Sequence, residues 1–211
     1  MPKILLFLIF FVIITTSLSC SDGVVDESLE HADKIMEVAP DSALSILDKI
    51  EAHDLRTDAQ KAKYALLKSI ALDKNYIDTK DFSILQPAID YYIEKGTPNQ
   101  KVKTYYYQGR IYQNQDNEAM ALESFINALG VDEGRVDSLI IARALVAQGS
   151  IFYSLFKIND FINNNKRASL IYKNLGRTDY EFSCLSNVFF ILLRHYWAVL
   201  DFMSGKYFAS F

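Results

Sequence analysis

The residues that could carry out chemistry are few in this sequence and form no known catalytic pattern. The three histidines, His31, His53 and His195, lie far apart, and none stands at metal-ligand spacing from a cysteine or from another histidine. The phosphate-binding, dinucleotide-binding, zinc-protease and nucleophile-elbow motifs are missing. Acidic side chains are plentiful, but on helices they are usually solvated. We therefore expect a non-enzymatic protein without a metal or cofactor.

The charge balance argues against nucleic acid as a partner. The 22 basic residues are outnumbered by 26 acidic ones, which gives a net charge of −4, whereas nucleic-acid binding usually requires a clustered basic surface. One basic pattern does recur. Its residues are spaced 40 positions apart in the sequence and are Lys63, Lys103 and Arg143. Such a series could hold the acidic groups of a partner, or it could simply keep the helix surfaces soluble.

The first residues of the chain have the features of an export signal. Lys3 supplies a small basic region, and Ile4–Ile14 is an unbroken apolar run. A membrane-spanning helix needs about 20 such residues, so this run is short for a span and has the length of a signal-peptide core. A polar segment, residues 15–19, separates it from Cys20.

This N-terminus resembles the signal of bacterial lipoproteins. In that family a small residue precedes a cysteine that is modified with diacylglycerol, and cleavage before the cysteine exposes an amine that is then acylated. Ser19 fits the small position and Cys20 the lipidated one, whereas Ser17 stands where an aliphatic residue is usual. The resemblance implies a signal peptide over residues 1–19, lipidation of Cys20 and a tether over residues 20–26. An ordinary secretory signal and a retained membrane anchor are the alternatives.

Apolar residues recur at spacings of three and four after the tether and predict an all-α chain of about nine helices. Pro40 is expected to end the first helix, Asp41 or Ser42 to cap the second, and Pro87 to kink the fourth or to delay its start by one turn. The expected helices are Asp26–Ala39, residues 41–50, Asp58–Asn75, Asp81–Lys95, two within Lys101–Glu133, Asp137–Phe156, Phe161–Asn174 and Thr178 to about Met203.

The segment Lys101–Glu133 has the clearest internal organisation and predicts two antiparallel helices. Its helices carry bulky, small and aromatic residues in a fixed order, namely Tyr105, Gly109, Tyr112, Ala121, Phe125 and Ala128. We expect the two helices to touch at Gly109 and Ala121. Ser69 and Gly149 repeat the small position at equal distances to either side of Gly109 in the sequence.

These units resemble tetratricopeptide (TPR) repeats, and the chain is similar to exported TPR lipoproteins of Gram-negative bacteria. The resemblance implies a TPR-like α-solenoid of antiparallel helix pairs over residues 27–176. It also implies that one face of each first helix lines a partner-binding groove. The residues at those positions include Lys63, Lys103, Tyr106, Arg110, Gln113, Arg143 and Tyr153.

The C-terminal segment, residues 177–211, departs from the repeat pattern. Phe189 stands where a small residue is expected, and apolar and aromatic side chains dominate the segment. Three interpretations remain open: a truncated form of a longer repeat protein, an aromatic cap on the preceding helix pair, or a dimer or membrane contact. Cys184 lies among apolar residues there and is expected to be buried.

Together these features predict a lipid-anchored protein–protein interaction module or scaffold at the cell envelope. It would be exported and would face the periplasm or the cell surface, with the membrane and an unidentified protein or peptide as its partners. The alternatives are the sensor part of a longer TPR regulator and a lipoprotein for glycan or nutrient uptake.

Overall fold

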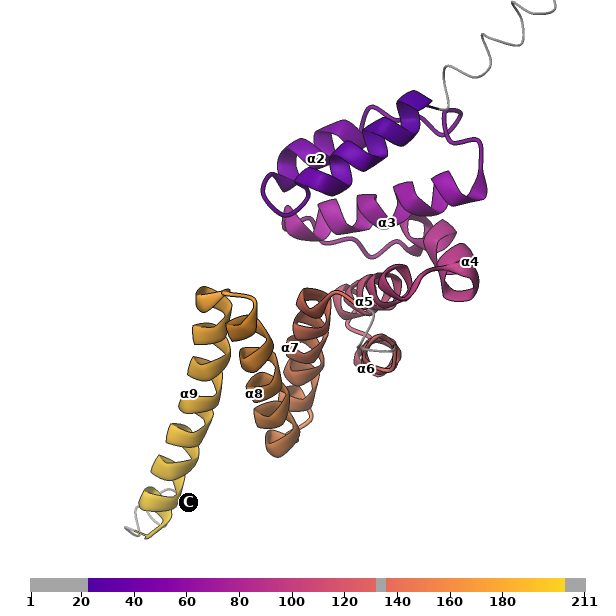
Figure 1. The fold of residues 1–211 in the computed structure, drawn as a ribbon. Coiled ribbons are helices and arrows are strands. Elements are labelled where there is room, and N and C mark those ends of the chain that lie inside the picture. The colour runs from indigo at the N-terminus through magenta and orange to yellow at the C-terminus, as the bar shows by residue number, and fades with distance from the viewer. Residues whose placement is uncertain (1–22, 132–135, 204–211) are drawn as a thin grey trace, which may run out of the picture. The chain divides into compact units, whose positions relative to one another are not determined.

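The computed structural model describes residues 23–131 and 136–203, and within these ranges the protein is all-α, without a strand (Figure 1). The expectation of an all-α chain is confirmed. A first helix covers residues 23–35. The elements that follow are α2 (Pro40–Leu47), α3 (Asp58–Lys74), the 3-10 helix η1 (Phe82–Ile84), α4 (Gln86–Lys95), α5 (Pro98–Asn114), α6 (Glu118–Leu129), α7 (Ser138–Ser154), α8 (Ile158–Asn174) and α9 (Thr178–Met203).

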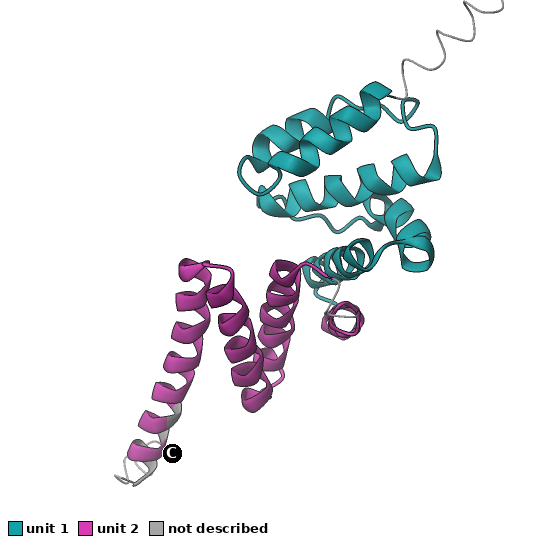
Figure 2. Ribbon diagram, viewed as in Figure 1, with its two compact units in different colours: residues 1–117 teal, residues 118–211 magenta. Residues whose placement is uncertain are grey.

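The chain divides into two compact units, which are described separately below (Figure 2). Unit 1 comprises residues 1–117 and unit 2 comprises residues 118–211. The boundary falls within Lys101–Glu133, so the expected contact between Gly109 and Ala121 would join the units and stays a prediction.

Unit 1 is built around α3, which packs against α2, α4 and α5. Its side chains supply a continuous apolar face, on which Ala62, Leu66 and Ile70 are buried at helical spacing. The ring of Phe82 in η1 lies 4.6 Å from that of Tyr112 in α5. This aromatic contact fixes the connection between α3 and α4 against α5.

In unit 2 the helices pack in chain order, α6 on α7, α7 on α8 and α8 on α9. Leu145 of α7 and Ala168 of α8 are buried, and Gly149 of α7 lies close to Asn164 and Asn165 of α8 at the α7–α8 interface. This interface also encloses amide groups, since Asn164 donates to the Leu145 carbonyl at 3.2 Å and to Gln148 Oε1 at 2.8 Å. These bonds satisfy polar atoms that would be costly to bury unpaired.

The interval of 40 residues seen in the sequence recurs in the positions at which the helices begin. The helices α3, α5 and α7 are each 17 residues long and begin at residues 58, 98 and 138, and α9 begins at residue 178. Their N-caps keep the same step, because Thr57 and Thr97 both form capping boxes and Asp137 accepts a hydrogen bond from the Leu139 amide.

The turns after these helices repeat as well. Tyr76, Asp116 and Phe156 follow one another at the same even step and have φ of 58°, 61° and 58°. Each is the left-handed residue of a Schellman turn, in which the following amide bonds to a carbonyl one turn back in the helix, as from Ile77 to Leu72. Bulky residues such as tyrosine and phenylalanine rarely adopt this conformation, so Tyr76 and Phe156 are strained positions.

Two local expectations about proline have different outcomes. The expectation that Asp41 or Ser42 caps the second helix is wrong, because Pro40 is itself among the first residues of α2 and Ala39 precedes it as the N-cap. Proline is favoured there because the first helical amides have no partner in any case. Pro87 likewise lies in the first turn of α4, which confirms a start one turn later than Asp81.

Candidate functional site

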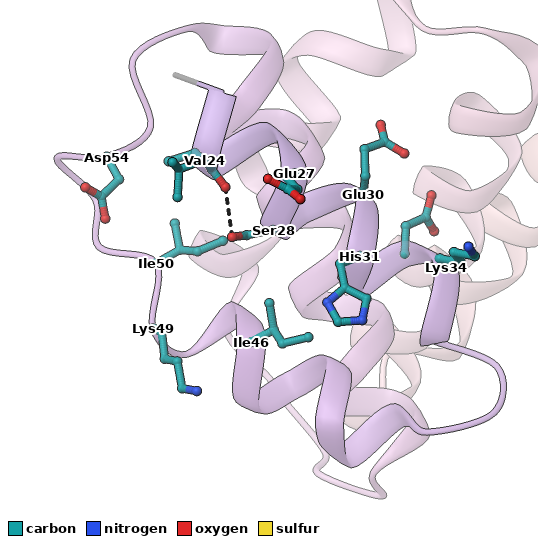
Figure 3. Close-up of a pocket in the computed structure, with 12 residues that line it drawn as sticks. Val24, Glu27, Ser28, Glu30, His31, Lys34, Ile46, Lys49, Ile50 and Asp54 are labelled. Atoms are coloured by element: carbon teal, nitrogen blue, oxygen red, sulfur yellow. Dashed lines mark hydrogen bonds between the residues drawn. The ribbon is translucent and has the colours of Figure 1, made fainter. Parts of the chain in front are cut away.

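A hollow in unit 1 lies between the helix of residues 23–35 and α2, together with the loop that follows α2 (Figure 3). It has a volume of about 1230 Å³. Val24, His31, Ile46 and Ile50 lie in the space between the two helices (Figure 3). Val24 and His31 share a face of the first helix because they are two turns apart, whereas Ile46 is on α2 and Ile50 is in the loop that follows it. The spacing of Val24 and His31 is the signal in the sequence that could have predicted this hollow.

The rim of this hollow carries both signs of charge. Its carboxylates and basic side chains are Glu27, Glu30, Asp33, Asp54, His31, Lys34 and Lys49. Most of these charged side chains are exposed. Ser28, which also lines the hollow, donates from Oγ to the Val24 carbonyl at 2.9 Å. With an apolar floor and a mixed rim, the hollow is suited to an amphipathic segment rather than to a single charged group.

The basic residues expected to line a groove in unit 1 are largely neutralised by the preceding helices. Lys63 on α3 forms an ion pair with Glu30 on the first helix, and Arg110 on α5 pairs with Asp73 on α3 at 2.8 Å. These pairs join segments that lie far apart in the chain. They reduce the positive charge that a partner would meet at these positions.

Arg110 is a partly buried charged residue of the expected groove. Its Nε donates to Asp73 Oδ1 at 2.8 Å, and its NH1 group donates to Gln113 Oε1 at 3.0 Å. Burial alone would lower the pKa of Arg110, but the neighbouring Asp73 carboxylate and Tyr106, with the hydrogen bond to Asp73, raise it above its ordinary value. Asp73 and Arg110 also line a small cavity of about 10 Å³ between α3 and α5.

The remaining groove residues differ in exposure. Tyr106 is 6% exposed, and its ring lies 4.9 Å from that of Tyr107, edge to face. Lys103 is half-buried. In unit 2, Arg143 is half-buried, and Tyr153 is 38% exposed and accepts a hydrogen bond from Arg194 on α9 at 3.2 Å. The groove residues therefore fall in both units, and their joint role as a binding face stays a prediction.

The repeat-signature positions are enclosed by helix packing. Ser69 and Gly149 are buried, as are Gly109 in α5 and the α6 residues Ala121, Phe125 and Ala128. A Cβ atom on Gly149 would lie 3.3 Å from Asn165 Nδ2 and 3.9 Å from the ring of Phe161. Gly149 thus allows α8 to approach α7 closely, with Phe161 beside it.

Cys20 and the signal segment lie outside the described residues. Among the helices that are described, none has the length and apolar character needed to cross a bilayer. The same part of the chain contains no cluster of three or more histidine, cysteine, aspartate or glutamate side chains that could hold a metal ion.

The chain matches no protein-family model, no curated protein and no solved structure.

Proposed function

We propose that this protein is a lipid-anchored helical-repeat module that binds another protein at the cell envelope. The observation that carries the proposal is the regular recurrence of helices, caps and left-handed turns at α3, α5 and α7. Repeated helices of equal length present equivalent side chains at even steps, and proteins of this kind use such surfaces to bind extended partners. A TPR-like solenoid is the arrangement that this repetition and the small residues Ser69, Gly109 and Gly149 favour.

The binding surface proposed for unit 1 is the solvent-accessible part of α5 around the half-buried Lys103. Because Glu30 and Asp73 already pair with Lys63 and Arg110, an acidic peptide would have to compete with these carboxylates. A partner with acidic and basic groups of its own fits the surface better, since it can exchange ion pairs rather than oppose them.

A pull-down with cross-linking and mass spectrometry from envelope extract tests this surface. The full chain and a Lys61→Glu control should retain the same partner, because Lys61 is an exposed residue of α3 outside the expected groove. A Lys103→Glu variant should recover at least about tenfold less of it, as expected when a central interface contact is reversed in charge. Equal recovery with both variants, or no reproducible partner, would contradict the proposal.

The anchor is tested separately by metabolic labelling with an alkyne analogue of palmitate. The full chain and a Cys184→Ala variant should incorporate the label and sediment with membranes, whereas Cys20→Ala should do neither. Stable attachment is expected because two or more acyl chains hold a protein firmly at a bilayer. Labelling that persists in Cys20→Ala would refute lipidation at this residue.

A further inference from the structure

The outer face of α9 carries a row of exposed apolar side chains with a heptad repeat. The row consists of Phe182, Leu185, Phe189, Leu192, Tyr196 and Val199, which are 73%, 47%, 58%, 51%, 59% and 44% exposed. The alternating steps of three and four are those of the a and d positions in a helix that pairs with another helix. We call these six residues the α9 seam.

The α9 seam is distinct from the face by which α9 packs in unit 2. Cys184 and Val188 are 3% and 7% exposed and lie on the side of α9 that meets α8. The seam is centred on an adjoining side of the helix, about a quarter turn around the axis. The packing of α9 within unit 2 therefore uses one face of the helix, and the α9 seam on the adjoining face remains accessible to another partner.

The repeat register shows what kind of helix can cover this seam. Phe182, Leu185 and Phe189 are the counterparts, one repeat later, of three residues that are buried in α7, namely Ala142, Leu145 and Gly149. Gly149 permits α8 to pack closely on α7, with a Cβ at that position only 3.3 Å from Asn165. Phe189 at the equivalent place excludes an equally close helix, so a covering helix must pack at a wider spacing, with large side chains filling the gap.

The composition of α9 argues for another protein surface rather than for a lipid surface. Helices that lie in the membrane interface usually have a polar face rich in lysine and arginine. The sequence of α9 has three acidic residues, Asp179, Glu181 and Asp201, against one arginine, Arg194. Arg194 also donates to the hydroxyl of Tyr153 in α7.

The seam and its apolar neighbours together expose an area close to that of a standard homodimer interface. Large apolar side chains expose on the order of 150–200 Å² when fully solvated, so the seam and its apolar neighbours, each about half exposed, offer roughly 700 Å² per chain. A standard interface buries about 800 Å² per partner, and the cores of homodimer interfaces are more apolar than those between different proteins. A two-fold axis would bring the aromatic residues of one seam between those of the other without any second binding surface.

We propose that α9 is a homodimerisation helix and that the α9 seam packs against the α9 seam of a second copy of this chain. This proposal does not depend on the partner proposed above or on lipidation of Cys20. It assigns the exposed aromatic residues to a symmetric helix–helix interface.

Cysteine cross-linking of the full chain in its own envelope tests the pairing. Each of the six seam residues is replaced singly by cysteine, and the membranes are oxidised and run on a non-reducing gel. A band of two copies, identified by mass spectrometry, is expected for at least one seam position and not for Ser183→Cys, which alters an exposed residue outside the seam. A parallel pair would cross-link at every seam position, and an antiparallel pair only near the two-fold axis.

Self-association of the full chain in mild detergent gives an independent measurement. Analytical ultracentrifugation should find a dimer for the unaltered chain and for Ser183→Glu, and at least about tenfold weaker association for Phe189→Glu. Tyr196→Glu provides a second variant if circular dichroism shows that Phe189→Glu has lost helix. A monomeric unaltered chain, no cross-linked dimer at any seam position, or cross-linking only to a different polypeptide would overturn the proposal.

Discussion

At the scale of single residues, the left-handed turns are the most strained feature described. A side chain with a Cβ atom costs about 1–2 kcal/mol in this conformation, and glycine avoids that cost. Three of the four turns nevertheless carry Tyr76, Asp116 and Phe156, whereas the turn after α8 carries Gly176 with φ of 67°. Tyr76 is 94% exposed and Phe156 is 88% exposed, so packing of their rings does little to offset the strain.

We expect Tyr76→Gly to stabilise the protein by about 0.5–1 kcal/mol, because relief of the strained turn outweighs the extra freedom of glycine in the unfolded chain. Urea unfolding followed by circular dichroism measures the change. Tyr76→Ala removes the ring but keeps the Cβ atom, so it should change stability little. Gly176→Ala should destabilise, since it introduces the same strain in otherwise open space. Destabilisation by Tyr76→Gly would show that the tyrosine ring makes a stabilising contact.

Cys184 provides a second test at this scale. The thiol is 3% exposed, and burial raises its pKa from 9.0 to about 11. Only about a thousandth of it is thiolate at pH 8, and the thiolate is the nucleophile. We expect Cys184 to react with iodoacetamide far more slowly than the exposed thiol of a Ser183→Cys variant, as measured by peptide mass spectrometry. Equal rates would mean that α9 opens readily from α8.

The same shift has a consequence for stability in alkali. The folded state holds the thiol proton more tightly than the unfolded chain does, so the contribution of Cys184 is fully present below about pH 9. It is lost as the pH rises from about 9 to about 11, because the unfolded chain releases the proton first. A Cys184→Ala variant should show a smaller loss of unfolding free energy across this window.

At the scale of helices, the close approach of α7 and α8 rests on Gly149. Alanine would need only a small shift of the Asn165 amide, which lies 3.3 Å from the position that the added Cβ atom would take, and it favours helix by about 1 kcal/mol over glycine. Leucine would force the helices apart and should cost about 1–3 kcal/mol. We therefore expect Gly149→Ala to be nearly neutral and Gly149→Leu to lower the thermal midpoint.

A matched control for this substitution is Ser150→Leu, which adds a side chain of the same kind at an exposed position of the same helix. It should leave the thermal midpoint within a few degrees of the unaltered protein. If Ser150→Leu lowers the midpoint as much as Gly149→Leu, then added bulk on α7 is harmful in general, and Gly149 has no special packing role.

The helices were predictable from the sequence because their signals are local. Apolar spacing, Thr97 followed by Gln100, and Gly96 before Pro98 depend on close neighbours in the chain, and the predicted start of α9 at Thr178 agrees with the structure. The start of α2 was predicted too late because Pro40 was expected to end the first helix, which ends at residue 35, whereas α2 begins with this proline. Its side chain alone does not distinguish these two positions.

The contacts between helices could not be read in the same way. Lys63 was identified by its regular step to Lys103, but its partner Glu30 depends on how two helices that are distant in the sequence lie side by side. The same holds for Asp73 beside Arg110 and for the hollow between the first helix and α2. The spacing of residues in the sequence predicts which side chains share a face of one helix. It does not predict which charged side chains of other helices lie opposite that face, because this depends on how the helices pack.

At the scale of the whole molecule, the two compact units can unfold together in one transition or separately. Repeat proteins are stabilised mainly by contacts between neighbouring elements, so local destabilisation need not spread along the chain. Lys101–Glu133 was predicted as a single repeat from its sequence, yet the boundary between the units falls at residues 117 and 118. Opening of one unit with the other still folded would show that this boundary limits cooperativity.

Hydrogen exchange measured by mass spectrometry on Gly149→Leu decides between these possibilities. We expect faster exchange in α7 and α8, because the substitution weakens their interface, and unchanged exchange in α3 of unit 1. Ser150→Leu should leave exchange unchanged in both units. Equal acceleration in α3 and α7 would contradict separate opening, since a single cooperative transition exposes every core amide with the same free energy.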